Sequence, residues 1–388
     1  MYLNVAEIES AITSLGSVYP DTTEIITPPH TTHEGRTTRL LRVGARRSDE
    51  APGILLLGGV HAREWVPPDA LISLAADLLE AHGSATGLGY GSSSFTAAQV
   101  ARVVENLDLF FFPCVNPDGR AFSQTTSAMW RKNRRPAPAG STSPSCAGVD
   151  LNRNFDFLWD HTAKFAPDAD VHTSDNPCDP QVYRGPAAAS EPETRNVVWA
   201  LDSHPRIRWM VDVHSAVPVI LHNWGSDQNQ STTPTDNFRN PRLDAVRGRP
   251  GDGIGEFIPE RDLRIAVELA DRMNDAARAV RDVDYGVEAA YGLYPTSGTS
   301  DDYAYGRHHV DPTATKVFGY TIECGDTFQP VFSEAEQVIR EVSAALLALA
   351  LDAPDVTDGA TDGSVERSRD GRTAPGQAAG ATALAHDM

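Results

Sequence analysis

The chain has 388 residues, a hydrophobic fraction of 40% and a net charge of −20 at pH 7. This length accommodates one large α/β domain or two medium ones, and the hydrophobic fraction is ordinary for a protein with a buried core. The strong negative charge argues against binding nucleic acid through its phosphates, which needs clustered Lys and Arg. Because the sequence has no run of about 18 apolar residues, we expect no membrane span.

Apolar periodicity predicts alternating strands and helices along the chain. Continuous apolar runs such as Ile54–Val60 are typical of strands buried on both faces. Ser190-x-x-Glu193 and Ser333-x-x-Glu336 have the capping-box spacing and are expected to start helices. The predicted elements are a helix at Val5–Val18, strands at Thr38–Val43 and Ile54–Val60, a helix opened by Pro67, a loop at Gly83–Ser94, a short helix through Val100, a strand at Leu107–Val115, a loop-rich stretch at Arg131–Asp179, a helix from Ser190 to His204, strands at Arg208–His214 and Val219–His222, a helix at Pro259–Val283, a strand at Lys316–Glu323 and a helix at Ser333–Leu351.

These patterns predict a single α/β domain with a mixed, mostly parallel twisted sheet and helices on both faces. We expect this catalytic domain to span residues 1–352. Residues 226–256 are polar and rich in Gly, Pro, Asn and Asp, which predicts a surface insertion, and residues 353–388 have few large apolar side chains, which predicts a disordered tail. In sheets of this kind, functional sites form beyond the carboxyl ends of strands.

The four cysteines bear on metal binding and on compartment. They include no CxxC pair, which argues against a cysteine-based zinc site. Cys146 and Cys178 lie in polar loops where a disulfide can form, whereas Cys114 and Cys324 lie in apolar runs and are expected to be free and buried. The N-terminus has no basic segment followed by an apolar stretch, so we expect no secretory signal in this sequence. The protein is then either cytoplasmic or a trimmed form of a secreted protein.

A candidate metal site follows from His61, Glu64 and His214. His61 and Glu64 come directly after a buried strand, where an imidazole and a carboxylate three residues apart can bind one cation. Catalytic zinc usually takes three protein ligands plus water, and His214, at the end of another predicted strand, completes a His2Glu set. Each part alone has a simpler explanation, because HxxE often occurs by chance and a single strand-end histidine is usually structural.

Several sequence blocks occur in the order found in one known family. The chain resembles the metallocarboxypeptidases of the pancreatic carboxypeptidase A and B type from about Val5 to about Leu351. The resemblance rests on His61–Trp65, Asn116–Gly119, Trp130–Lys132, Gly148–Phe155, Tyr183–Pro186, Ser190–Thr194, His214–Ser215, Tyr294–Tyr303 and Thr321–Glu323.

The resemblance implies a zinc-dependent exopeptidase that hydrolyses the C-terminal bond of peptides or proteins through a metal-activated water. The implied ligands of one Zn²⁺ are His61, Glu64 and His214. Glu323 matches the general base, which takes a proton from water and passes it to the leaving amine. Arg131 matches the residue that stabilises the oxyanion. Because Lys132, Arg134 and Arg135 are close by, a solvated basic loop is the alternative for Arg131.

The resemblance also implies how a peptide terminus is held. Asn152 and Arg153 match a carboxylate clamp, since a guanidinium can bond both oxygens in one plane. Tyr294 matches a mobile residue that closes over the terminus, and Arg63 would bind carbonyls further along the substrate. Asp150 matches a carboxylate that orients the first zinc-binding imidazole.

Substrate preference and compartment follow from three further matches. Asp301 aligns with the floor of the pocket for the C-terminal side chain, which implies acceptance of Lys or Arg together with neutral residues, because a buried carboxylate is costly unless paired. An apolar preference is the alternative. Cys146 and Cys178 match a family disulfide, which favours an oxidising compartment and a secreted mature form. We expect a monomer.

Two other functions stay open. The chain could be a zinc hydrolase of the same fold that acts on cell-wall peptides or other amides, or an inactive carboxypeptidase-like binding module. The presence of Asn152, Arg153 and Tyr294 together favours an ordinary peptide C-terminus. The complete set of implied ligands and base favours an active enzyme over a binding module.

Overall fold

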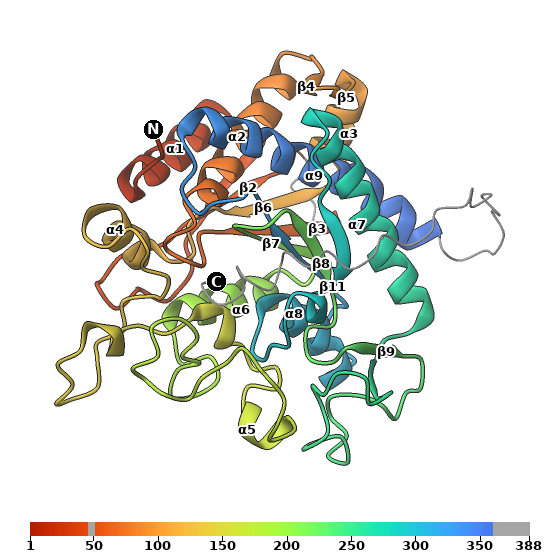
Figure 1. The fold of residues 1–388 in the computed structure, drawn as a ribbon. Helices are drawn as coiled ribbons and strands as arrows, with labels where there is room; N and C mark the ends of the chain where they lie inside the picture. Colours follow the sequence, from red (N-terminus) through yellow and green to blue (C-terminus); the bar gives the residue numbers. More distant parts are fainter. Residues whose placement is uncertain (46–50, 360–388) are drawn as a thin grey trace.

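The computed structural model describes residues 1–45 and 51–359 (Figure 1). One sheet has the strand order β1-β2-β6-β3-β7-β12-β8-β11, and four of its neighbouring pairs are parallel and three antiparallel. Its strands are β1 (Thr23–Ile26), β2 (Leu40–Val43), β3 (Gly53–Gly58), β6 (Asp108–Phe112), β7 (Ile207–His214), β8 (Val219–His222), β11 (Gly286–Ala289) and β12 (Phe318–Glu323). Two smaller pairs are β4 (Leu88–Tyr90) with β5 (Ser93–Phe95) and β9 (Asn229–Ser231) with β10 (Gly255–Phe257).

Helices cover both faces of the sheet, as Figure 1 shows. The helices are α1 (Val5–Val18), α2 (Val66–Gly83), α3 (Ala97–Asn106), α4 (Pro117–Thr125), α5 (His161–Lys164), α6 (Pro192–Ser203), α7 (Glu260–Arg281), α8 (Ser300–Val310) and α9 (Phe332–Gly359). One core packs α1, α2, α3, α7 and α9 against the sheet, and a second core packs α6 and α8 against the other face. None of the helices within the described ranges is long and apolar enough to cross a bilayer.

Side-chain alternation along β7 decides which face carries the polar groups. Val211 and Val213 belong to the core under α7 and α9, whereas Met210 belongs to the core under α6 and α8. Because successive side chains of a strand point to opposite faces, Asp212 and His214 share the face of Met210. These two polar side chains therefore lie on the α8 side of the sheet.

The predicted fold class is confirmed, because the structure has a single α/β domain with a mixed, mostly parallel sheet. Strands β1 and β11 were not predicted; they lie at the two edges of the sheet, where partly exposed strands lack a continuous apolar run. Helices α4 and α8 were not predicted either, because they carry several buried polar residues in place of an apolar stripe. The segment expected to be a plain loop at Gly83–Ser94 contains β4 and most of β5.

The boundaries of α6 and α9 differ from the predictions. The N-cap position of α6 is Glu191, whose side chain makes no capping bond, and the Ser190 hydroxyl donates to Glu191 Oε1 at 2.7 Å, so the predicted capping box is wrong. Helix α9 continues to Gly359, past the predicted end at Leu351, so the start of the expected tail is helical. The rest of that tail, residues 360–388, lies outside the described residues.

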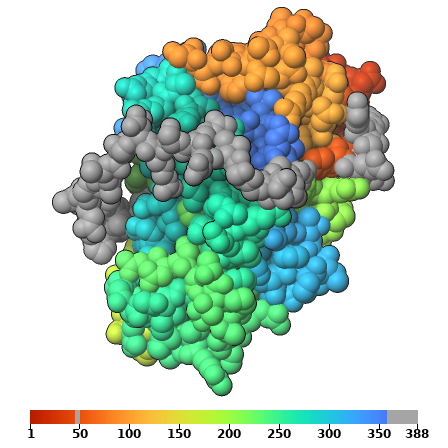
Figure 2. Space-filling view, turned by 90° about the vertical axis from the view of Figure 1, so that its right-hand side faces the viewer, coloured from red at the N-terminus to blue at the C-terminus, as the bar shows by residue number. Residues whose placement is uncertain are grey.

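Residues 226–256 are only partly a surface insertion. Figure 2 shows the green segment that precedes α7 at the lower end of the molecule. Its two ends are nevertheless buried: Ser226 and Asp227 at one end and Glu256 at the other are at most 1% exposed. Arg247 Nε donates to Glu256 Oε2 at 3.0 Å inside this stretch. The segment is thus anchored by buried polar contacts, which its polar composition does not reveal.

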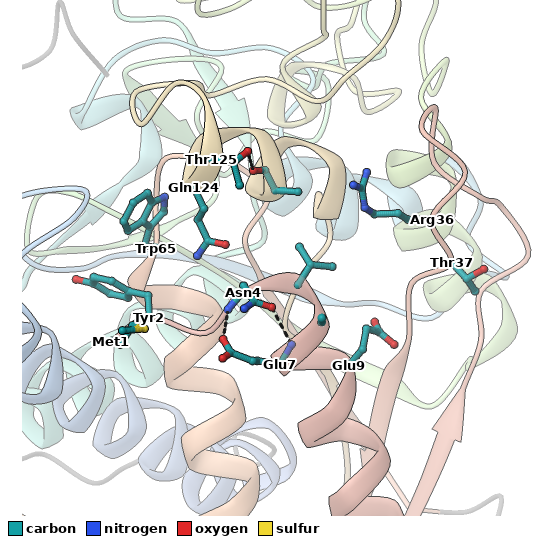
Figure 3. Close-up of a pocket in the computed structure, with 13 residues that line it drawn as sticks. Met1, Tyr2, Asn4, Glu7, Glu9, Arg36, Thr37, Trp65, Gln124 and Thr125 are labelled. Carbon is teal, nitrogen blue, oxygen red and sulfur yellow. Dashed lines mark hydrogen bonds between the residues drawn. The ribbon is translucent and has the colours of Figure 1, made fainter.

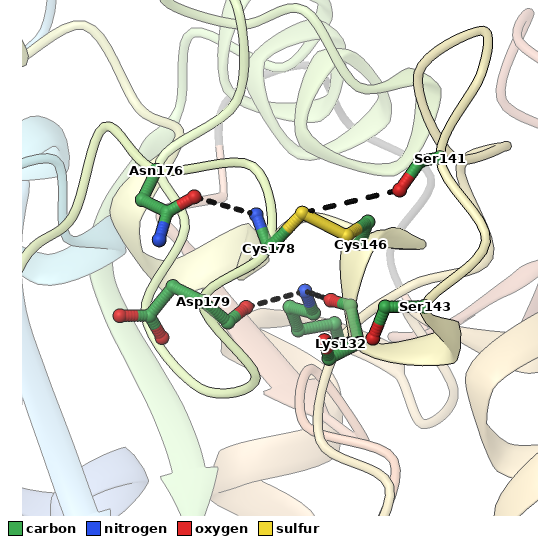
Figure 4. The surroundings of a disulfide bond; sticks show 8 residues. Lys132, Ser141, Ser143, Cys146, Asn176, Cys178 and Asp179 are labelled. Atoms are coloured by element: carbon green, nitrogen blue, oxygen red, sulfur yellow. Dashed lines mark hydrogen bonds between the residues drawn. A yellow bond between two sulfur atoms is a disulfide. The ribbon is translucent and has the colours of Figure 1, made fainter.

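Cys146 and Cys178 form a disulfide, and the predicted pair is therefore confirmed (Figure 4). The Lys132 ammonium lies beside the bridge and donates to the Ser145 carbonyl at 2.8 Å and the Asp179 carbonyl at 2.6 Å. The bridge and the lysine together join two loops. Cys114 and Cys324 are buried free thiols, as predicted.

Candidate metal centre

The neighbouring parallel strands β3 and β7 bring three potential ligands together. Gly58 at the end of β3 is level with Val213, so the chain that leaves β3 passes close to His214. His61 Nδ1 lies 2.7 Å from Glu64 Oε1 and 2.9 Å from His214 Nδ1, and His214 Nδ1 lies 3.0 Å from Glu64 Oε2. All three side chains are buried. The predicted convergence of these residues is thus present in the geometry.

The electrostatics of this cluster suit a divalent cation. Burial alone would raise the pKa of Glu64, but the two imidazoles hold it well below its usual range, so the carboxylate is ionised. The outer nitrogen of each imidazole faces another carboxylate: His61 Nε2 lies 3.1 Å from Asp150 Oδ1, and His214 Nε2 lies 3.1 Å from Asp212 Oδ2. A metal-binding histidine usually has a carboxylate, a backbone carbonyl or a water at its other ring nitrogen. Two imidazoles and one carboxylate fit zinc.

Glu323 lies next to the cluster because β12 pairs in parallel with β7. Glu323 is level with His214 in that pairing and shares its face of the sheet. Its Oε2 has no hydrogen-bond partner within the described part of the chain. Burial raises the pKa of Glu323 to about 7, outweighing the attraction of the His214 imidazole, which lowers it. The group can therefore hold or release a proton near neutral pH.

The guanidinium groups of Arg131 and Arg63 lie beside the cluster. Arg131 donates from Nε and Nη2 to Asp150 Oδ2 at 3.1 and 3.0 Å, and the Ala62 N–H donates to the Arg131 carbonyl at 2.9 Å. Arg63 packs with its guanidinium carbon 4.2 Å from the centre of the Phe328 ring. Because Arg131 is only 4% exposed, the alternative of a solvated basic loop is wrong for this residue.

Arg153, Asn152 and Tyr294 lie on the adjoining side. Arg153 donates from Nε to the His172 carbonyl and from Nη1 to the Asn152 carbonyl. The Tyr294 ring stacks on the His172 ring at 4.4 Å, and the Arg153 guanidinium carbon lies 5.8 Å from the centre of the tyrosine ring. The residues expected to clamp a carboxylate therefore occur together.

Asp301 lies in the first turn of α8 and is buried. The Thr321 hydroxyl of β12 donates to Asp301 Oδ2 at 3.2 Å, and the Asp302 N–H donates to Asp301 Oδ1 at 2.9 Å. Within residues 1–45 and 51–359, no Lys, Arg or His is at ion-pair distance from Asp301. A buried carboxylate with neutral donors alone is a candidate receptor for an incoming cation.

Comparison with known proteins agrees with this geometry. The family model for zinc carboxypeptidases matches residues 8–347, which is most of the chain. The chain belongs to the zinc carboxypeptidase family. It is thus a metallocarboxypeptidase, a zinc-dependent hydrolase that acts on the C-terminal end of peptide substrates.

The carboxypeptidase is similar to individual relatives with different names. It is 28% identical to carboxypeptidase B of Astacus astacus over 84% of this chain and 87% of that protein. It is 29% identical to an inactive metallocarboxypeptidase of Arthroderma otae over 76% of this chain, but spans only 45% of that protein. The solved structure of bovine thrombin-activatable fibrinolysis inhibitor in complex with tick carboxypeptidase inhibitor has a TM-score of 0.68 at 20% identity, covering 92% of this chain and 98% of that one, and shows the shared fold.

Two residues of the candidate site in this carboxypeptidase, Asp212 and Ser300, were not predicted from the sequence. Asp212 contacts His214, and the Ser300 hydroxyl donates to Asp212 Oδ2 at 2.6 Å. The signal for Asp212 was present, because a residue two positions before a strand-end ligand shares its face. Ser300 had no comparable signal, since its role depends on how the first turn of α8 packs on the sheet.

A second group of potential ligands, His33, Glu191 and Glu193, is explained without a metal. Glu191 Oε1 accepts from Ser190 and Arg135, and Glu191 Oε2 accepts from Asn133 and lies 2.8 Å from His33 Nε2. These partners occupy both carboxylate oxygens. The cluster is therefore a polar network that fixes the start of α6.

A cavity of about 750 Å³ lies near the N-terminus and is also separate from the metal centre (Figure 3). Tyr2, Asn4 and Gln124 point into it, and α1 and α4 provide much of its wall. None of the three candidate ligands lines it, although Trp65, next to Glu64 in sequence, does. The three candidate ligands thus lie at strand ends and outside this cavity.

Proposed function

We propose that the carboxypeptidase removes C-terminal Lys or Arg, and neutral residues as well, from peptides and proteins. The observation that carries the proposal is the convergence of His61 Nδ1, His214 Nδ1 and the Glu64 carboxylate beside Glu323. These three ligands would hold one Zn²⁺ and leave a position open for the reaction. A bound zinc ion supplies Lewis acidity, which acidifies water and polarises a carbonyl.

Glu323 would act as the general base. Its side chain is on the same face as His214, and burial brings its pKa to about 7, close to the value at which a base works best in neutral solution. It would take the proton of the attacking water and return it to the amine that leaves. Its Oε2, which has no partner in the described residues, is available for this transfer.

Recognition of a free terminus would rest on the arginines. Asn152 and Arg153 would bind the terminal carboxylate, with Tyr294 closing from the side. Arg131 would stabilise the developing oxyanion; a donor of this kind typically lowers the barrier by about 3–4 kcal/mol. Arg63 would bind a carbonyl further along the peptide. Support comes from the burial of the three arginines and Asn152, together with the ion pair that holds Arg131 on Asp150.

Asp301 would select the C-terminal side chain. Among the described residues, its oxygens accept neutral hydrogen bonds from Thr321 and the Asp302 backbone, so a Lys or Arg side chain would provide a counter-charge. Loss of one partner of a buried charge pair typically costs about 2–5 kcal/mol. We therefore expect Asp301→Asn to lower kcat/KM for a C-terminal Arg by about 30-fold or more relative to a C-terminal Ala.

The test uses matched peptides that end in Arg, Phe or Ala, including hippuryl-Arg and hippuryl-Phe, each with a free C-terminus and as the amide. The proposal expects hydrolysis of the free acids, none of the amides, and loss of activity with chelator. Asp311→Asn, at the exposed end of the same helix, is the control and should keep the Arg/Ala ratio. An unchanged ratio in Asp301→Asn would disprove the pocket assignment. Hydrolysis of the amides would favour a hydrolase of other amides, and inactivity on every substrate would favour a binding module.

We also propose that the protein works outside the cell as a monomer. The Cys146–Cys178 disulfide supports an oxidising compartment, where such bonds persist. Sedimentation of the purified protein tests the monomer, and thiol labelling of the protein directly after extraction tests whether the disulfide forms in its native compartment. Complete labelling of all four cysteines in freshly extracted protein would contradict an extracellular location.

A further inference from the structure

Two rows of polar side chains project from the α8 face of the sheet. In the pairing of β7 with β12, His214 is level with Glu323, and Asp212 is level with Thr321. Because residues two apart on a strand share a face, both rows point the same way. The first row belongs to the metal centre, and Thr321 of the second bonds Asp301 at the selectivity pocket. The two rows are therefore adjacent parts of one surface.

Asp212 connects these rows through a single oxygen. Its Oδ2 lies 3.1 Å from His214 Nε2 and accepts the Ser300 hydroxyl at 2.6 Å. The imidazole nitrogen is at ion-pair distance but is not aligned as a hydrogen bond. Asp212 is completely buried, and among the described residues its Oδ1 accepts no hydrogen bond. A buried carboxylate is costly unless it is paired, and in the described part of the chain the basic side chain within ion-pair distance of Asp212 is the His214 imidazole.

The contacts continue from Ser300 to the other imidazole. The Ser300 N–H donates to Asn152 Oδ1 at 2.8 Å, and the Asn152 N–H donates to Asp150 Oδ1 at 2.9 Å. Asp150 Oδ1 lies 3.1 Å from His61 Nε2. A continuous series of polar contacts thus runs behind the metal centre from one imidazole to the other. It passes through Asn152, which we place at the substrate carboxylate, and through the first turn of α8.

We propose that Asp212 is a positioning residue that fixes the His214 imidazole for metal binding and ties it, through Ser300, to the substrate-binding turn of α8. The physical reason is that a carboxylate at the outer nitrogen orients a ligating imidazole and favours a proton on that nitrogen, which leaves the inner nitrogen free for the metal. Asp212 lies at the outer nitrogen of His214 as Asp150 lies at that of His61, where the contact is a hydrogen bond. The inference rests on the proposed zinc site.

The experiment measures the zinc dissociation constant by competition with a chromogenic chelator, which needs no activity. Removal of such a supporting group typically weakens metal binding about 10–100-fold, and this is the effect expected for Asp212→Asn. Ser300→Ala keeps the carboxylate but removes its link to α8, so we expect a smaller loss of zinc affinity together with a raised KM. It also serves as a second test if Asp212→Asn does not fold.

Two further variants make the result specific. Asp262→Asn is the matched control, because Asp262 is also a buried aspartate but bonds Tyr305 and Lys316, away from the metal centre. It should keep wild-type zinc affinity. His61→Ala tests the metal centre itself. Zinc affinity within about threefold of wild type in both Asp212→Asn and Ser300→Ala, with loss in His61→Ala, overturns this inference alone. Unchanged affinity in His61→Ala instead overturns the proposed zinc site.

Discussion

Replacement of Glu323 by Gln tests the proposed chemistry at one atom. The substitution keeps the size of the side chain but removes its capacity to take a proton. A well-placed general base typically contributes a factor of about 10²–10⁴, so kcat should fall by that factor, which corresponds to about 3–5 kcal/mol of barrier. Among the described residues, the other carboxylates at the metal centre are placed differently, because Glu64 contacts both imidazoles, and Asp150 and Asp212 lie at their outer nitrogens.

The same variant should also change how the rate depends on pH. The base acts when ionised, and its pKa is raised to about 7, so the wild-type rate should fall as the pH decreases through and below this value. The charge of bound zinc would lower that pKa and move the acidic limb to lower pH. Steady-state kinetics on hippuryl-Arg from pH 5 to 9 measures both effects, with zinc content as the control. If Glu323→Gln retained more than a tenth of the wild-type kcat and the same acidic limb, Glu323 would not be the base.

Three further predictions concern stability and are measured by urea unfolding. Glu193 is fully buried, and burial raises its pKa from 4.5 to about 7, so this group should contribute about 3 kcal/mol to the stability lost as the pH rises from 4.5 to 7. Glu193→Gln should lose less stability over this range by about that amount, and an identical pH dependence in both proteins would contradict the prediction. Joint replacement of Cys146 and Cys178 by Ser opens a crosslink between positions 32 residues apart and should cost about 3–4 kcal/mol, and a cost below about 1 kcal/mol would count against the model of a constrained unfolded state. Leu56→Ala removes a buried side chain from the core under α2 and should cost about 2–5 kcal/mol with little change in the denaturant slope; a smaller cost would mean that the cavity collapses.

The central strands could be predicted because burial on both faces leaves a clear mark on the sequence. The run Ile54–Val60 predicted β3 and the run Arg208–His214 predicted β7 to within a few residues. Edge strands β1 and β11 leave a weaker mark, because their side chains are partly exposed. Local chemistry could also mislead, as at Ser190, where the capping-box spacing occurs but Glu191 occupies the cap.

For the metal centre, the sequence supplied the ligand types and the order of the motifs, and the structure supplied their convergence. His61 and His214 are far apart in the chain, and only the pairing of β3 with β7 brings their Nδ1 atoms to 2.9 Å. Asp212 was missed although its position two residues before His214 places it on the same face of the strand, and Ser300 was missed because its role depends on a tertiary contact with Asp212. Such contacts between strands and helices have no short-range sequence pattern.

Anomalous diffraction at the zinc edge, from crystals of the protein purified with zinc, tests the central claim most directly. The account predicts one strong peak about 2.0–2.2 Å from His61 Nδ1, His214 Nδ1 and a Glu64 oxygen. A peak at His33, Glu191 and Glu193 with none at His61 would contradict it, as would fully loaded protein with no peak at either cluster.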